Sequence, residues 1–99
     1  MEVTKTQTGD KLILRISGKL SAATAEAFGT EVEEAIAESH HIEMDFKEVS
    51  YVASAGLRVL IVAQKELNAC KGDLVLRNVK EDILEVFEIT GLDEVFDIQ

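Results

Sequence analysis

The sequence contains no proline, no tryptophan and only one cysteine, Cys70. A single cysteine excludes an internal disulfide framework, and its place in an apolar-periodic segment indicates a reduced, half-buried thiol. The longest uninterrupted apolar run covers residues 59–63. A membrane-spanning helix needs roughly 20 such residues. No basic and apolar leader opens the chain. We therefore expect a soluble, cytoplasmic protein with no membrane insertion.

Positive charge is also scarce, because ten Lys and Arg residues stand against nineteen Asp and Glu residues, for a net charge of −9. No segment gathers enough cations to follow a phosphate backbone, which argues against direct nucleic-acid binding and against attraction to an anionic membrane. Aromatic residues form only 5% of the chain, too few for a base-stacking surface. Apolar residues form 46% of the 99 positions. This is enough for one domain with a single core, spanning residues 1–99.

The hydrophobic pattern alternates between strand and helix periods. Strand-like alternation occurs in four segments, residues 3–7, 12–17, 41–46 and 74–76. Helical spacing predicts three helices, over residues 21–39, 54–69 and 81–90. A hairpin turn at Gly9 makes the first strand pair antiparallel, whereas strands separated by helices pair in parallel. We therefore expect an α/β fold, with a mixed sheet of four to five strands and helices packed against it.

The segments between these elements carry further expectations. Residues 47–50 form a short link after the third strand, and Ser21 or Thr24 caps the first helix. Gly72 caps the second helix and Gly91 ends the third. The apolar residues within 92–98 must then dock on the core.

The most informative segment covers residues 45–58, where a buried strand is followed by a helix that begins with Ser54 at or near its N-cap. A helix start presents free backbone N–H groups and the positive end of the helix dipole, so added negative charge is tolerated there. Two interpretations of Ser54 stay open: a residue that only caps the helix, or a functional hydroxyl. Gly56 would allow another chain or a phosphate to approach the backbone closely.

An enzymatic interpretation of this segment is weak. A nucleophile elbow places glycine two residues before the serine, and this chain has Val52 there. The only histidines, His40 and His41, adjoin a strand start, and adjacent strand residues point to opposite faces, so they do not share a metal easily. The residues offer no catalytic constellation, and we expect a protein that is not an enzyme, with no cofactor and no metal.

The stretch Tyr-Val-Ala-Ser-Ala-Gly-Leu-Arg-Val-Leu at residues 51–60 resembles the signature of STAS domains, most of all that of bacterial anti-sigma factor antagonists. Residues 18–25 resemble the family's loop before its first helix, and residues 90–98 resemble its usual ending. The resemblance covers essentially the whole chain. It implies a STAS fold and a protein that binds a serine-kinase anti-sigma factor and so releases a sigma factor.

The resemblance also implies a switch at Ser54. Phosphorylation by the kinase breaks the complex, and a PP2C-type phosphatase restores it. Asp45 falls where the family usually keeps an aspartate close to this serine. We expect a monomer whose partner-binding residues are Ser21, Asp45, Ala53, Ser54, Ala55, Gly56 and Arg58.

The chain departs from the family pattern at two of these positions. Ser21 stands where many relatives have aspartate, and Ala53 stands where relatives commonly have serine or aspartate, which leaves Ser54 as the one hydroxyl at this tip. Arg58, one helical turn after Ser54, either contacts a phosphate or acidic partner or is a solvated cation. A second function also stays open, that of a STAS accessory subunit of a membrane transport ATPase system, because a shared fold does not decide function.

Overall fold

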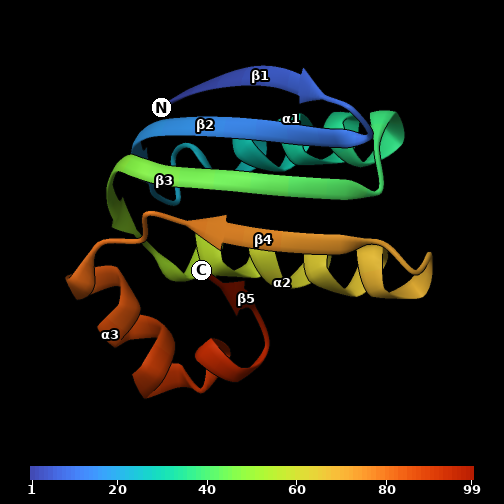
Figure 1. Cartoon of the computed structure of the whole chain (residues 1–99). Helices are drawn as coiled ribbons and strands as arrows, with labels where there is room; N and C mark the ends of the chain where they lie inside the picture. Colours follow the sequence, from blue (N-terminus) through green and yellow to red (C-terminus); the bar gives the residue numbers. More distant parts are fainter.

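The computed structural model describes residues 1–99 and shows a five-stranded sheet with α1 and α2 on one face (Figure 1). The strands, in their order across the sheet, are β1 (Glu2–Thr8), β2 (Lys11–Leu20), β3 (His41–Val52), β4 (Asp73–Arg77) and β5 (Asp97–Ile98). The helices are α1 (Ala25–Glu38), α2 (Ser54–Ala69) and α3 (Glu81–Thr90), followed by the 3₁₀ turn η1 (Leu92–Glu94). Only β1 and β2 pair antiparallel. The predicted α/β fold with a mixed sheet is confirmed.

The core lies between the sheet and the two helices α1 and α2. Leu14, Met44 and Leu76 are in register on β2, β3 and β4, and all three are fully buried. They belong to one apolar cluster with Phe28 of α1 and Leu60 of α2. Apolar burial of this kind is the main favourable term in folding, so the two helices are held on the sheet by these alternate strand positions.

Strand β3 is longer than the sequence pattern indicated. The link expected at residues 47–50 is wrong, because the strand continues from His41 to Val52. Its pairing with β2 shifts register twice, and each shift adds one residue to β3. Buried positions in this half therefore recur every third residue, at Phe46, Val49 and Val52. The two-residue period that identifies a strand is lost where the bulges occur.

The end of α2 also differs from the expectation. The residue with left-handed backbone is Lys71, at φ 62°, rather than Gly72. The Lys71 N–H donates to the Asn68 carbonyl at 3.2 Å and the Gly72 N–H donates to the Leu67 carbonyl at 2.7 Å, which is the Schellman pattern. Gly72 is required for space instead, because a Cβ there would overlap the backbone carbonyl oxygen of His40.

The single cysteine is not half-buried. Cys70 is the C-cap residue of α2 and its side chain is exposed, with the sulfur 3.5 Å from the Leu67 carbonyl oxygen. The apolar period of a helix predicts burial only while the helix continues, and α2 ends at Ala69. None of the helices is both long and apolar enough to cross a lipid bilayer.

The C-terminal segment docks as predicted. Gly91 ends α3 in the left-handed conformation, at φ 76°. Phe96 is buried, and its ring meets that of Phe87 edge to face, with 5.5 Å between the ring centroids. Strand β5 then adds to the edge of the sheet beside β4. The segment after α3 is therefore part of the folded domain.

Gly29 in the middle of α1 provides a test of how the two helices meet. An added Cβ would lie 3.7 Å from Val59 Cγ2 of α2, an ordinary van der Waals contact. Because alanine loses less conformational entropy than glycine in a helix, Gly29→Ala should raise the free energy of unfolding by about 0.5–1 kcal/mol. Urea denaturation followed by circular dichroism measures this change. A lower midpoint would show that the helices are packed more tightly here than the structure describes.

Candidate functional site

The candidate site lies at the end of the sheet where the parallel strands β2 and β3 both finish. Leu20 and Val52 are the last paired residues. The next residue of each strand, Ser21 or Ala53, begins the connection to α1 or α2, and the Ala53 N–H donates to the Leu20 carbonyl oxygen at 2.7 Å. Carboxyl ends of parallel strands are a common place for binding sites in α/β proteins. The topology thus brings the loop that contains Ser21 beside the start of α2.

Ser54 is the first residue of α2, and it is exposed. Ala53, in extended conformation, occupies the N-cap position, and no side chain caps this helix start. The backbone N–H groups of Ser54, Ala55 and Gly56 thus have no acceptor within the helix. No acidic residue lies in the first turn, unlike in α1 and α3. The interpretation of Ser54 as a capping residue is therefore wrong, and its hydroxyl lies beside the uncompensated positive end of a helix.

Gly56 has a different role from the one expected. It is buried, and a Cβ there would lie 3.0 Å from both the Cβ and the carbonyl oxygen of Leu20 and 3.4 Å from Val52 Cγ1. The close approach that requires a glycine here is that of the chain's own strands, so the reason expected for this glycine, the approach of a partner or a phosphate, is wrong. Gly56 instead sets the distance between α2 and β2 and thereby positions Ser54.

The loop before α1 is organised by Thr24, a role that the sequence did not reveal. Thr24 Oγ1 accepts a hydrogen bond from the Ser21 N–H at 2.9 Å and donates one to the Lys19 carbonyl oxygen at 2.7 Å. Thr24, one of the two residues expected to cap α1, occupies its N-cap position, but no side chain makes a capping hydrogen bond there, and the helix begins at Ala25 rather than at Ser21. The half-buried Ser21 hydroxyl lies 3.4 Å from Thr24 Oγ1. A hydroxyl four residues after a strand end was the available signal for this turn.

Asp45 does not belong to the site. It lies within β3, and its neighbours Met44 and Phe46 both point into the core beneath the helices. Successive side chains of a strand point to opposite faces, so the Asp45 carboxylate lies on the face that α1 and α2 leave uncovered. Ser54 begins a helix on the other face. The prediction that Asp45 lies close to Ser54 is therefore wrong.

The contacts of Asp45 are structural. Its Oδ1 accepts hydrogen bonds from the Asn78 side-chain amide at 3.0 Å and from the Lys47 backbone N–H at 2.9 Å, and Arg15 Nε lies 3.7 Å from Oδ2. Burial raises the pKa of Asp45, but the bonds from Asn78 and Lys47 and the positive charge of Arg15 together bring this pKa below its usual value. Asp45 thus joins the end of β4 to β3 as an ionised carboxylate.

Arg58 is exposed and has no acidic side chain within ion-pair distance. It borders two surface grooves, each of about 350 Å³. One groove lies between α2 and the segment after α3, and its lining includes Ser54, Ile61 and Leu92. The other lies between α1 and α2. Arg58 therefore stands as a free cation on the ridge that separates the two grooves, next to Ser54.

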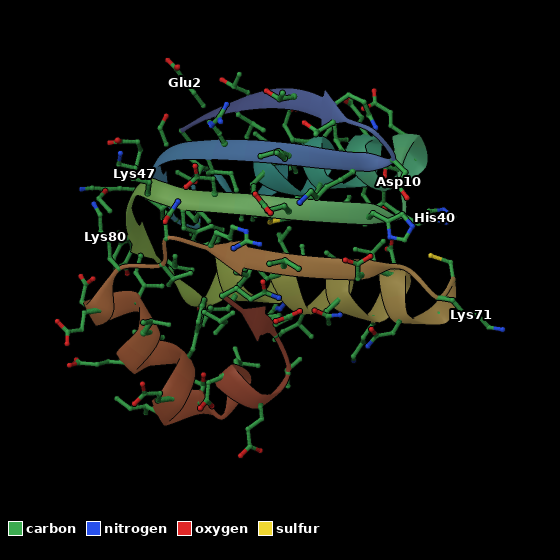
Figure 2. The ribbon with its side chains drawn as sticks, in the orientation of Figure 1. Glu2, Asp10, His40, Lys47, Lys71 and Lys80 are labelled. Carbon is green, nitrogen blue, oxygen red and sulfur yellow. The ribbon has the colours of Figure 1, made fainter.

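The histidines lie at the opposite end of the sheet. Figure 2 shows His40 near Asp10 and Lys71, far from Lys47 and Lys80 at the end where β3 and β4 finish. The His41 ring bonds to the Asp73 carboxylate, and this bond is the main cause that raises the pKa of His41. No group of three or more His, Cys, Asp or Glu side chains is arranged to hold a metal ion.

Comparison with known proteins finds matches over nearly the whole chain. The family model described as STAS domain matches residues 2–99. The anti-sigma-B factor antagonist of Listeria monocytogenes is 31% identical over 96 residues, which are 96% of this chain and 84% of the relative. The solved structure of an anti-sigma factor antagonist from Mycobacterium paratuberculosis has a TM-score of 0.88 at 19% identity, covering 98% of this chain and 83% of that one.

The Bacillus cell fate determinant SpoIIAA in its phosphorylated form has a TM-score of 0.76 at 22% identity, covering 99% of this chain and 91% of that one. At this identity the likeness shows a shared fold. The family match extends over nearly every residue, and the Listeria relative is matched over most of its own length. The chain therefore belongs to the STAS domain family.

Proposed function

We propose that this protein is an anti-sigma factor antagonist, which binds a serine-kinase anti-sigma factor and thereby releases a sigma factor in the bacterial cytoplasm. The observation that carries the proposal is the exposed Ser54 hydroxyl at the uncapped start of α2. The name of the Listeria relative supports it. On this proposal the protein acts by binding, as a monomer, and has no catalytic activity or cofactor of its own.

The contact surface that we propose consists of Ser21, Ala53, Ser54, Ala55 and Arg58. The two alanines are small and only half-buried, so a partner surface can approach the serine hydroxyl closely. Arg58 adds a positive charge that forms no ion pair with an acidic side chain of this chain. Gly56 supports this surface from below and does not contact the partner.

Phosphorylation of Ser54 by the bound kinase is proposed to end the complex, and a PP2C-type phosphatase is proposed to restore it. A phosphate adds about −1.5 to −2 charges at neutral pH. In the complex this charge would have to lose its water, which is costly. In the free protein it faces the unbonded N–H groups and the positive dipole end of α2. Both effects favour the free state over the complex.

The test compares wild-type protein with Ser54→Glu as bait in a lysate of the source bacterium. The wild type should retain a small ATP-binding anti-sigma kinase, and Ser54→Glu should bind the purified kinase at least tenfold more weakly. Negative charge at a helix N-terminus contributes about 0.3–1 kcal/mol, so the same variant should melt no lower than the wild type. Ser54→Ala, which removes the hydroxyl without adding charge, is the matched control and should still bind.

Two outcomes would contradict the proposal. If wild type and Ser54→Glu bind the kinase equally well, negative charge at Ser54 does not end the complex. Capture of a transport ATPase by both baits would favour the accessory-subunit function instead.

A further inference from the structure

The groove between α1 and α2 lies on the outside of the helix layer, adjacent to the proposed contact surface. Its floor is built from small or apolar residues, Ala25 and Gly29 of α1 and Ala55, Val59 and Val62 of α2. The Val62 side chain is 43% exposed and is one of the few large apolar side chains at the surface. No element of the fold covers this floor. We call it the α1–α2 groove.

The sequence spacing shows that the groove is lined by one continuous row of residues on each helix. On α1 its residues recur every fourth position, at Ala25, Gly29 and Glu33, which places them on one face of the helix. On α2 the corresponding row passes through Val59 and Val62 to residue 66. At 1.5 Å per residue the α1 row is about 12 Å long, or roughly two helical turns. The two rows each end in a glutamate.

The first of these glutamates, Glu33, lines the groove, and the second, Glu66, interacts with it from α2. The hydrogen-bonding interaction with Glu66, followed by slight desolvation and by charge repulsion, raises the pKa of the exposed Glu33 carboxyl. Neither residue takes part in any ion pair of the chain. Like charges held this close destabilise the free protein, and a cation placed between them would relieve the repulsion.

We propose that a short amphipathic helix of the anti-sigma factor lies in the α1–α2 groove, with apolar side chains on Val59 and Val62 and one lysine or arginine between Glu33 and Glu66. A helix fits because side-chain ridges of a third helix pack into the groove between two others. A second copy of this chain is disfavoured, because each copy carries a charge of −9.

The inference rests on the proposed function, since it extends the surface at Ser54 along the same helix. Ala55 and Arg58 line the α1–α2 groove and belong to the Ser54 surface as well. A partner seated on Ser54 therefore reaches this groove without crossing any other element. The paired glutamates define the far end of the contact.

The experiment measures the affinity of purified variants for the anti-sigma kinase that the wild type captures. The double variant Glu33→Gln/Glu66→Gln keeps the side-chain shapes and removes both charges, and it should bind about tenfold more weakly while melting higher than the wild type. Val62→Gln should also weaken binding about tenfold, because it removes an apolar contact. The matched control is Glu81→Gln/Glu85→Gln, which removes two exposed charges from α3 and should bind as the wild type does.

The outcomes separate the two proposals. If both groove variants bind with unchanged affinity while Ser54→Glu still weakens binding, the anti-sigma factor does not bind in the groove. The proposed function would remain in place. An equal loss in the α3 control would show that net charge acts instead of the groove, which also overturns the inference. A wild-type bait that binds no anti-sigma factor would overturn the proposed function and the groove with it.

Discussion

Phe87→Ala is expected to lower the free energy of unfolding by about 3–5 kcal/mol, the usual cost of deleting a fully buried aromatic ring. Phe87 has no exposed surface, and its ring supports Phe96 of the C-terminal segment. Its removal leaves a cavity and also releases the residue that holds β5 beside β4. Because small domains are stable by only about 5–15 kcal/mol, the variant should be close to unfolding at moderate temperature.

Urea denaturation measures the stability loss, and limited proteolysis of residues 92–99 shows whether the segment after α3 has detached. Ile89→Ala is the control, since Ile89 lies on the same helix but is 85% exposed. It should change stability by no more than about 0.5 kcal/mol. Similar losses in the two variants would mean that helix propensity, rather than docking of the segment, accounts for the effect.

Gly72→Ala should cost about 3 kcal/mol, at the upper end of what overpacking does. The added Cβ has no room beside the His40 backbone carbonyl, and backbone cannot yield as a flexible side chain can. The expected loss is therefore much larger than that of an ordinary surface substitution, and opposite in sign to the gain expected at Gly29. Thermal denaturation of both glycine variants tests this, because Gly72→Ala should melt below the wild type and Gly29→Ala should melt above it.

Affinity provides the second measurement on Gly72→Ala. Gly72 follows the far end of α2, a helix of 16 residues that starts at Ser54. At 1.5 Å per residue this helix is about 24 Å long and separates Gly72 from Ser54, so the folded fraction of the variant should still bind the anti-sigma kinase. Weakened binding per folded molecule would show that strain at this turn is transmitted along the helix to Ser54.

Much of the fold could be predicted from periodicity, because α2, α3 and the antiparallel hairpin each keep one regular period between clear end signals. The second half of β3 could not, because two bulges change the spacing of buried residues where Val49 and Val52 turn inward. A bulge depends on how a strand pairs with its neighbour, and the residues of one segment do not reveal that pairing. The same holds for Gly72, whose neighbour His40 is distant in sequence.

The site was predicted in part for related reasons. Ser54 and the Ser21 loop follow strand ends, and strand order alone brings them together. Asp45 was misplaced because one step along a strand reverses the face, so an error in where β3 ends changes the neighbourhood of every side chain near it. Gly56 was misassigned because a glycine that admits a partner and a glycine that admits the chain's own strand look alike in sequence.

The uncapped start of α2 has a consequence for how long the protein lasts in a cell. Proteases remove proteins largely through their unfolded fraction, which rises steeply when stability falls. A phosphate at Ser54 meets unbonded N–H groups rather than a side-chain cap, so on the proposed mechanism the inactive form unfolds no more often than the active one. Inactive copies then persist as a reserve, and the speed of reactivation is set by phosphate hydrolysis rather than by new protein synthesis.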